Sequence, residues 1–473
     1  FFDQAFVIQQ NSPPILNINS DLKNIELTSS LNLLSKNKSE VLPTEIMITN
    51  PANPTLKLHN QQIDMHIRNF NNYDGYISIG KKLPGKFKNF IEEPGLNIYL
   101  YSRFITEDSL IYAIPKNSKP ASIKINKVAF DIKNFTFFNN SFSDLNGLFE
   151  LNSSEIIGNL VSDKLNLNLR MDSTGFMRVE IKDSSISDVE FINSKKSSFD
   201  STLNARLIVK NSSIGKVKIK DLNVYLVNNK KNFTANNLKL TSNLISIKPL
   251  KKSSIAYFSI NKTKPLYKIS GDFLIKDSSK IPYLRDFTDF SYFDGSLNLQ
   301  WEELSTLSYL EGEGSFILKD LTIKDSISDS LALNLLGVLN LRNILGKLAN
   351  LDLSIDEYTS MQLGRVEGDL LFSKSKLRLA SPLFIETNAA KMRWVGQINK
   401  NSKNNLDALD LNLDLRIRVG ENIPWYAAIL GGLPAVAGSA VINEIFEEDI
   451  NNLTNYQYEI VGTISEPKLK RIK

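Results

Sequence analysis

The sequence predicts an all-β fold, a long, twisted and curled sheet that forms an open hydrophobic groove with a few short helices capping its C-terminal end. Two observations predict the sheet: apolar and polar residues alternate with period two along most of the chain, and helical signals are few. The groove follows from a resemblance that is described below.

The clearest alternation lies in LDLNLDLRIRVG, residues 409–420. In an extended strand successive side chains point to opposite faces, so this segment has one dry and one wet face. The apolar face carries Leu411, Leu413, Leu415, Ile417 and Val419, and the other carries Asn412, Asp414, Arg416 and Arg418. The segments KLNLNLRMD, KVKIKDLNVYLV and GSLNLQW, which begin at Lys164, Lys216 and Gly295, follow the same pattern.

A loose repeat supports successive hairpins or meander units that are added to one growing sheet. Each copy has a glycine, an alternating strand, often a Lys-Asp pair, and a further strand. Copies begin at Gly175, Gly215, Gly271, Gly314 and Gly368. We expect the glycines and the Lys-Asp or Asn-Ser clusters to supply the turns between strands.

Helices are expected in three places: near 282–290, near 331–350, and in the uncharged stretch NIPWYAAILGGLPAVAGSAVINEIF, residues 422–446. They are too scarce to cover a long sheet. A sheet with one apolar face has to bury that face against something. From the pattern alone, a second sheet, a closed or solenoidal core, and a groove filled by another apolar molecule all remain open.

Composition excludes several classes of function. The chain of 473 residues contains no cysteine, so thiolate metal sites, disulfides and cysteine nucleophiles are excluded. The net charge of +5 is spread along the chain, apart from the terminal KLKRIK, which argues against nucleic acid as a partner. No phosphate-binding loop, dinucleotide fingerprint, nucleophile elbow or zincin helix occurs, so we expect no enzymatic activity and no cofactor.

The two histidines, His59 and His66, are the remaining candidates for metal ligands. The local pattern is extended, which predicts opposite faces for residues seven apart. We therefore expect surface polar residues and no metal site.

The C-terminal half resembles a known family. GDFLIKDSSKIPYLRDF, FDGSLNLQWEEL, LEGEGSFILKDLTI, LLGVLNLRNILGKLANLDLS and LGRVEGDLLFSKSKLRLASPLFIETNAAKMRWVGQINK occur in order, followed by LDLNLDLRIRVGENIPWYAAILGGLPAVAGSAVINEIF and NYQYEIVGTISEPKLK. This succession, over roughly Gly271 to Lys470, resembles the C-terminal region of YhdP-type proteins of the AsmA-like family. Residues 1–270 share only the generic strand pattern, and their assignment rests on continuity.

The resemblance implies a function in lipid transport. Family members look like curled sheets that form an apolar trough, are anchored upstream in the inner membrane of diderm bacteria, and reach across the periplasm. The expected activity is to shield and conduct phospholipid acyl chains between inner and outer membranes, for outer-membrane lipid homeostasis. This chain would be a periplasmic portion, since FFDQAF at its start has no targeting element. Its expected partners are phospholipids, the inner leaflet of the outer membrane, the inner membrane through an anchor outside this chain, and unidentified proteins.

On this resemblance we divide the chain into three parts: a repeated β-strand groove segment at 1–270, an AsmA-like β-groove with short helices at 271–420, and a helical cap with a final strand at 421–473. Candidate residues for the lipid groove share the apolar phase of their strands. They are Phe273, Ile275, Leu297, Leu299, Phe316, Leu318, Leu370, Phe372, Leu411, Leu413, Leu415 and Ile417.

The uncharged stretch is long enough to span a bilayer, but Pro424, Pro434 and the Gly431-Gly432 pair interrupt it. Two short helices are the better prediction. They would either plug the end of the sheet or contact the outer membrane at the end of the trough. The cap or membrane-contact candidates are Trp425, Tyr426, Ile429, Leu430, Val441, Ile442, Ile445 and Phe446.

Two other classes of function stay open. One is a periplasmic scaffold for outer-membrane biogenesis that carries no lipid and whose sheet faces are fully packed. The other is a surface adhesin or glycan-binding solenoid, for which we would expect exposed aromatic clusters on a flat face. The aromatic residues here lie mostly in the apolar phase of the strands.

Overall fold

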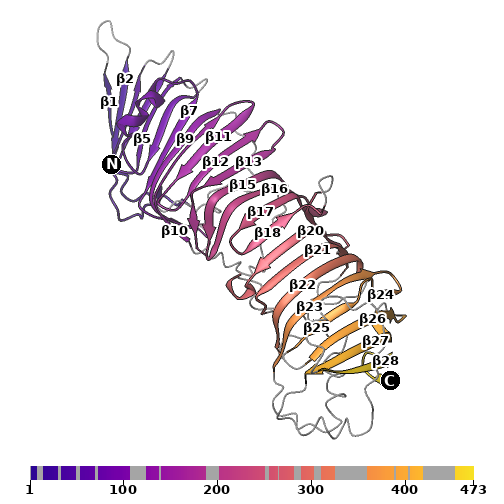
Figure 1. Ribbon diagram of the computed structural model, residues 1–473. Coiled ribbons are helices and arrows are strands. Elements are labelled where there is room, and N and C mark those ends of the chain that lie inside the picture. The colour runs from indigo at the N-terminus through magenta and orange to yellow at the C-terminus, as the bar shows by residue number, and fades with distance from the viewer. Residues whose placement is uncertain are drawn as a thin grey trace. The chain divides into compact units, whose positions relative to one another are not determined.

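The structure is a computed structural model (Figure 1). It describes residues 2–7, 14–29, 34–49, 54–69, 73–106, 124–137, 140–187, 202–250, 255–264, 266–281, 289–302, 310–324, 360–387, 390–402, 405–418 and 453–472. Its regular structure is β-strand apart from two short 3-10 helices, and the strands belong to one large sheet. The all-β prediction is confirmed. The helices expected near 282–290, 331–350 and within 421–452 lie largely or wholly outside the described residues.

The chain divides into two compact units: Phe1–Phe199 with Asn204–Gly215, and Asp200–Leu203 with Lys216–Lys473. We call them unit 1 and unit 2. The division falls between strands β15 and β16. The sequence-based boundaries at 270 and 420 follow the resemblance and stay predictions.

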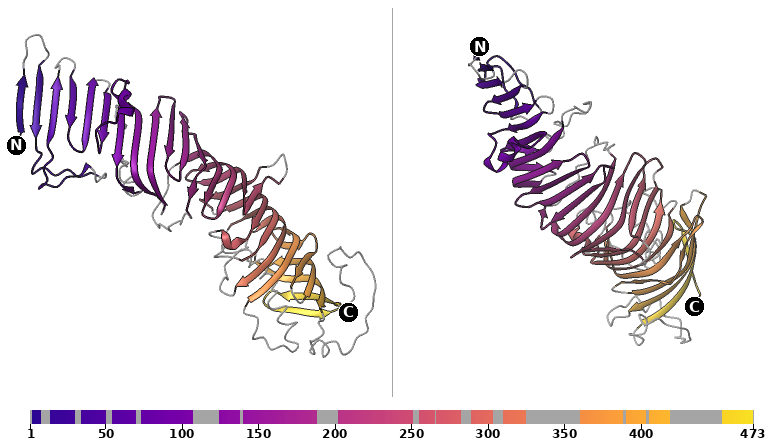
Figure 2. Two further views of the ribbon diagram at one scale, coloured as in Figure 1. Left: turned by 60° about the vertical axis from the view of Figure 1, so that its left-hand side comes forward. Right: turned by 90° about the horizontal axis from the view of Figure 1, so that it is seen from above.

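In unit 1 the strands lie side by side nearly in chain order (Figures 1 and 2). Their bounds are β1 Phe2–Val7, β2 Ile15–Ser20, β3 Thr44–Thr49, β4 Thr55–His59, β5 Ile63–Asn69, β6 Asp74–Ile79, β7 Leu96–Ser102, β8 Ile105–Thr106, β9 Ile125–Phe137, β10 Asn140–Leu151, β11 Glu155–Val161, β12 Asn166–Asp172, β13 Met177–Lys182, β14 Ser185–Ile186 and β15 Leu203–Ile214.

Most neighbours in unit 1 pair antiparallel, as hairpins predict, but β6–β7, β7–β9, β8–β9, β13–β15 and β14–β15 pair parallel. A parallel pair needs a crossover connection that returns the chain to the same end of the sheet. The crossover from β6 to β7 contains the 3-10 helix η2, Gly85–Ile91. The prediction of successive hairpins or meander units is therefore wrong at these parallel pairs.

Unit 2 continues with antiparallel strands in chain order. Their bounds are β16 Val217–Asn228, β17 Asn232–Ser242, β18 Ile245–Lys248, β19 Tyr257–Asn261, β20 Leu266–Lys276, β21 Tyr292–Trp301, β22 Glu311–Lys324, β23 Ser360–Phe372, β24 Lys376–Leu379, β25 Leu383–Glu386, β26 Ala390–Lys400, β27 Leu406–Arg418, β28 Leu453–Thr463 and β29 Pro467–Arg471, with the 3-10 helix η3 at Ser278–Lys280.

Two positions in unit 2 hold a pair of short strands in place of one long strand. β18 and β19 both lie between β17 and β20, and β24 and β25 both lie between β23 and β26. Pro249 follows β18, and Pro382 stands between β24 and β25. Because proline has no backbone N–H, it cannot donate a hydrogen bond to the ladder, and the strand is interrupted there.

The predicted turn residues are only partly turns. Gly175 has φ of 80° and lies in the turn between β12 and β13, but Gly271, Gly314 and Gly368 lie inside strands. Likewise, Asp320 of a Lys-Asp pair has φ of 52° inside β22. A left-handed Asp inside a strand is typical of a local irregularity of the ladder, which makes the turn prediction wrong at these positions.

Candidate functional site

The candidate site is the apolar face of the sheet. In unit 1 the pairing register of neighbouring strands keeps apolar residues in line across this face. Paired residues on neighbouring strands lie on the same face. One such row runs from β2 to β15 through every strand except the short β8 and β14. Its members are Ile18, Ile46, Leu58, Met65, Ile77, Ile98, Val128, Phe149, Gly158, Leu169, Val179 and Leu207.

Every side chain in this row is half-buried, apart from the buried Gly158. A parallel row through Leu100, Phe130, Leu160, Leu167 and Ile181 is half-buried as well. Side chains in one layer shield one another laterally and leave their tips exposed. The apolar face of unit 1 is thus continuous and partly accessible across its strands.

The opposite face of unit 1 holds the larger buried aromatic cluster. Tyr76, Tyr99 and Ala129 are buried there, together with Phe90 from η2. Phe87 of η2 lies against Phe90 and Tyr99, with ring centroids 5.0 and 5.3 Å away. Burial, then the neighbouring Asp131, raises the pKa of the Tyr99 phenol above its usual range. The 3-10 helix η2 therefore covers part of the polar face, whereas the apolar face holds a smaller buried cluster of Ile105, Ile132 and Leu145.

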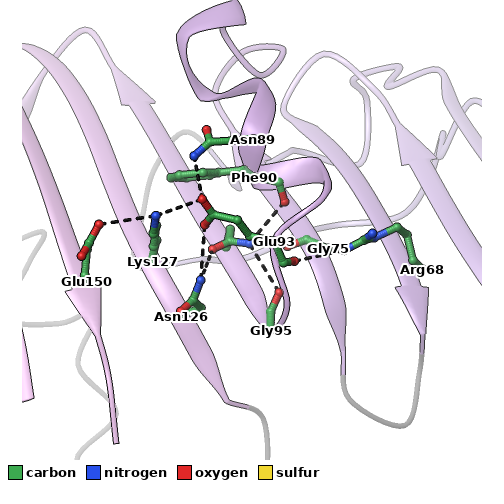
Figure 3. Close-up of polar contacts among 10 residues, drawn as sticks. Arg68, Gly75, Asn89, Phe90, Glu93, Gly95, Asn126, Lys127 and Glu150 are labelled. Carbon is green, nitrogen blue, oxygen red and sulfur yellow. Dashed lines mark hydrogen bonds and ion pairs between the residues drawn. The ribbon is translucent and has the colours of Figure 1, made fainter. Parts of the chain in front are cut away.

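Figure 3 shows the polar contacts that attach the crossover to this face. The amide Nδ2 of the fully buried Asn97 lies 3.2 Å from the carbonyl oxygen of Phe90 and 3.3 Å from that of Gly75. Lys127 Nζ lies 3.0 Å from Glu93 Oε1 and 3.4 Å from Glu150 Oε1. Because these groups are satisfied by one another, the network stabilises the crossover.

In unit 2 the same kind of row crosses the sheet, and it contains the predicted groove residues. One row passes through Ile275, Phe293, Leu318, Val366, Ile385, Met392, Leu415 and Tyr456. Register and alternation place Phe273, Leu297, Leu299, Phe316, Leu370, Phe372, Leu411 and Leu413 on that face too. Ile417 pairs with Ala390, and its side chain lies outside the description.

Exposure along this face falls toward the C-terminal strands. Phe273, Ile275, Leu297 and Phe316 are half-buried. By contrast, Leu370 and Phe372 are 7% and 4% exposed, and Leu413 is fully buried at 0%. These residues belong to the largest hydrophobic cluster of the described chain. Register thus brings the predicted residues together on one face, while a groove open to solvent is not seen around β23–β27.

Glycines on the apolar face make room for large neighbours. A Cβ on Gly368 would lie 2.9 Å from Leu383 Cδ1, and one on Gly295 would lie 2.7 Å from the ring of Phe293. Gly147 and Gly158 occupy equivalent places beneath Phe130 and Phe149 in unit 1. Aromatic rings and branched side chains can therefore lie flat over the backbone of these glycines and fill gaps in the apolar surface.

The two histidines lie on the same face, which contradicts the predicted opposite faces. His59 ends β4 and pairs with Asp64, and His66 on β5 pairs with Lys57 of β4. The turn at Asn60–Gln62 reverses the chain, so the alternation does not run straight through. His59 Nδ1 lies 3.2 Å from Asp64 Oδ1, and Tyr76 donates a hydrogen bond of 3.0 Å to Asp64 Oδ2. Across the described ranges, no group of three or more His, Asp or Glu residues is placed to hold a metal ion.

All eight cap or membrane-contact candidates, Trp425 to Phe446, lie outside the described residues. None of the helices described here is long and apolar enough to cross a membrane. The apolar face of unit 1 was not named as a site from the sequence, because the resemblance began near residue 271. Its signal was the same alternation, visible at Leu165, Leu167, Leu169 and Met171.

Comparisons of the chain with models of known protein families, with curated proteins and with solved structures found no match.

Proposed function

We propose that this chain binds phospholipid acyl chains on the apolar face of its sheet and conducts them along that face without chemical change. The observation that carries the proposal is the row from Ile18 to Leu207, in which apolar side chains follow one another from strand to strand and stay half-buried. A lipid tail laid across such a row would bury methylenes worth about 0.8 kcal/mol each.

The geometry suits movement along the sheet. The rows offer similar apolar side chains at each strand, spaced about 4.8 Å apart, and on the described strands they lack an ion pair on that face. A surface without deep local minima lets a bound chain slide, whereas fixed charges would hold it. In this proposal the chain is a periplasmic portion of an AsmA-like, YhdP-type protein, its groove faces the lipid tails, and the head groups stay in water.

A photo-crosslinking pair on β12 tests the proposal. Leu169 points to the apolar face and Asn168 to the polar face, and both belong to one short strand. With a photoreactive side chain at Leu169, the purified chain should capture phospholipid from vesicles, and the variant at Asn168 should capture little. Equal capture at both positions, or capture at neither, would refute a lipid-binding face.

A second candidate function is a scaffold that carries no lipid, and the packing of unit 2 favours it. Leu363, Val366, Trp394, Ile398 and Ile460 are all 0% exposed. A closely packed face of this kind is what we expect of a structural sheet that carries no lipid. Lipid extraction from the purified chain separates the two: a scaffold should contain no phospholipid, and a lipid carrier should contain it in proportion to protein.

A further inference from the structure

Four lysines stand together at one end of strands β16–β20 in unit 2. Lys230 and Lys231 lie in the turn between β16 and β17, and Lys262 and Lys264 lie in the turn between β19 and β20. The two turns are neighbours, because β17 pairs with β19 and the backbone N of Lys262 lies 2.6 Å from the carbonyl oxygen of Lys231. All four lysines are exposed, and we call them the lysine rim.

Hydrogen bonds fix the backbone of both turns. In the first turn, Asn229 Oδ1 accepts a hydrogen bond of 2.9 Å from the backbone N–H of Lys231. In the second, Asn261 Oδ1 accepts one of 3.2 Å from the backbone N–H of Lys264. Asparagine side chains that bond the backbone a few residues further on are typical of tight turns. A ligand at the rim therefore has only the lysine side chains to order.

The charge of the rim is not neutralised by the groups that hold it. Lys262 Nζ lies 2.6 Å from Asn228 Oδ1 and 3.0 Å from the carbonyl oxygen of Asn229, and both oxygens are neutral. No rim lysine takes part in an ion pair within the described ranges. Glu302 and Glu311 stand at the same end of β21 and β22, so the basic region is confined to β16–β20. Such a cluster attracts anions.

An accessible part of the apolar face adjoins the rim. Phe233, Ile260 and Tyr267 form one row across β17, β19 and β20, close to the two turns. A second row, two residues further along the strands, consists of Ala235, Phe258 and Ile269. All six side chains are half-buried, in contrast to the fully buried Leu413 of the later strands. An apolar surface that water reaches therefore lies directly beside a basic one.

This juxtaposition favours an anion that is joined to an apolar chain. A nucleic acid or an acidic peptide would use the lysines and leave the apolar rows in water. An uncharged fatty chain would use the rows and leave the lysines without a partner. In an anionic phospholipid a phosphate stands next to the acyl chains, and lysine binds phosphate well as a point charge.

We propose that the lysine rim binds the negatively charged, phosphate-bearing head group of a phospholipid whose acyl chains lie on the adjoining apolar rows of β17–β20. This inference rests on the proposed lipid-binding function and adds the class of lipid that is preferred. The site is open to solvent on both its basic and its apolar part, so a lipid reaches it without rearrangement of the packed strands β23–β27.

The test loads the full chain from vesicles of phosphatidylglycerol or of phosphatidylcholine with the same acyl chains. The vesicles are removed by sedimentation, and the lipid that stays on the chain is measured. Only phosphatidylglycerol has a net negative head group, so it should load at least about 5-fold better, the factor expected for one lysine beside an anionic lipid surface. The preference should shrink as the salt concentration rises, because exposed charges are screened.

Two variants with the same change in net charge locate the effect. The rim variant keeps Lys262, whose ammonium group joins the two turns, and carries K230Q, K231Q and K264Q. It should load both lipids equally, with phosphatidylcholine loading unchanged. The control removes three exposed lysines from the crossover between β6 and β7 in unit 1, and carries K82Q, K86Q and K88Q. The control should keep the preference.

Each outcome decides a different proposal. Equal loading of the two lipids by the wild type overturns the role of the rim and leaves lipid binding intact. Failure of the wild type to load either lipid overturns the proposed function itself. An equal loss of preference in both variants assigns it to the net charge of the chain and contradicts the rim.

Two further measurements separate a bound head group from other anions. Inorganic phosphate at the concentration of the lipid, with ionic strength held constant by chloride, should leave the preference unchanged. If it abolishes the preference, the rim is a site for the free ion. If anionic vesicles retain the wild type but the recovered chain carries no excess of phosphatidylglycerol, the rim contacts a membrane surface and the proposal is wrong.

Discussion

Unit 1 and the C-terminal strands of unit 2 follow the same alternation but differ in what their apolar faces meet. From β2 to β15 the apolar row stays half-buried, whereas Leu377, Ile385, Met392 and Leu411 in unit 2 are at most 2% exposed. Alternation therefore determines which side chains share a face. It does not determine whether that face is covered.

The two regions also place their aromatic residues differently. In unit 1 the buried Phe90, Tyr76 and Tyr99 lie on the polar face beneath or within the crossover helix. In unit 2, Trp301, Trp394 and Tyr456 lie on the apolar face and belong to its core. Unit 1 thus packs its crossover helix on the side away from the apolar row and buries only the small cluster of Ile105, Ile132 and Leu145 on the apolar side, whereas unit 2 uses the row itself as its core.

The largest difference in stability between the two regions should follow when a charged side chain is placed on the apolar row of each. Leu413→Asp places a carboxylate at a fully buried position, and we expect a loss of more than about 4 kcal/mol in unfolding free energy. Leu169→Asp places the same group at a half-buried position, where water reaches it, and should cost far less. Protease susceptibility mapped along the chain measures both. Similar losses at the two positions would show that the face of unit 1 is covered.

A second comparison concerns the two faces of unit 1. Phe90→Ala removes a ring that is 1% exposed, and we expect a loss of about 3 to 5 kcal/mol. Phe130→Ala removes a half-buried ring from the apolar face and should cost about 1 to 1.5 kcal/mol, roughly half of what full burial contributes. Chemical unfolding of the two variants gives the values. The opposite ranking would place the main core of unit 1 on its apolar face.

A third comparison uses glycines beneath large side chains. Gly368→Ala would set a methyl group 2.9 Å from Leu383 Cδ1 and 3.2 Å from Leu383 Cα, among side chains with no room to move, and should cost about 1 to 3 kcal/mol. In Gly158→Ala the three atoms nearest to the added methyl group all belong to the ring of Phe149, which is half-buried and can swing outward. We expect a loss below about 1 kcal/mol there, measured by thermal unfolding. A larger loss for Gly158→Ala would contradict an open face.

The strands and their faces were predictable from the sequence, because period-two alternation is a local property of the chain. KLNLNLRMD became β12 and LDLNLDLRIRVG gave β27, with Leu409 to Leu415 buried on one side. The shared face of Phe316, Leu370 and Leu413 was predictable for the same reason. Register then extends the pattern from one strand to the next.

Turns, crossovers and burial were less predictable, because they depend on residues far apart. Gly314 and Gly368 resemble turn signals locally, and only the neighbouring Leu297 and Leu383 show that they make space inside the sheet. The parallel β6–β7 joint depends on how η2 packs against Tyr99 and Ala129. Similarly, the burial of the Trp394 indole N–H without an acceptor among the described residues becomes visible only when its neighbours are known to be apolar.

The smallest predicted effect is a pH dependence of local stability that unit 1 should show and the C-terminal strands of unit 2 should not. His66 lies on the polar face of unit 1, where burial first, then Lys57 and Arg68, lower its pKa below 6.5, although Asp64 opposes this. The ring of Tyr76 meets it edge-on with centroids 6.3 Å apart. Between the lowered pKa and 6.5 the unfolded chain binds more protons than the folded one, so acidification favours unfolding. Stability of β5 and β6 should fall as the pH drops through this window and level off below the folded pKa.

Both histidines of the chain lie in unit 1, so β26–β28 should show no such dependence above the range where carboxylates titrate. Hydrogen exchange measured strand by strand between pH 7.5 and 5.5 provides the readout. His66→Gln should abolish the change at β5 and β6, whereas the control His59→Gln should retain it, because burial lowers the pKa of the His66 ring and the control leaves that ring in place. A dependence that survives His66→Gln, or that is equally large in β26–β28, would assign the effect to carboxylates shared by both regions.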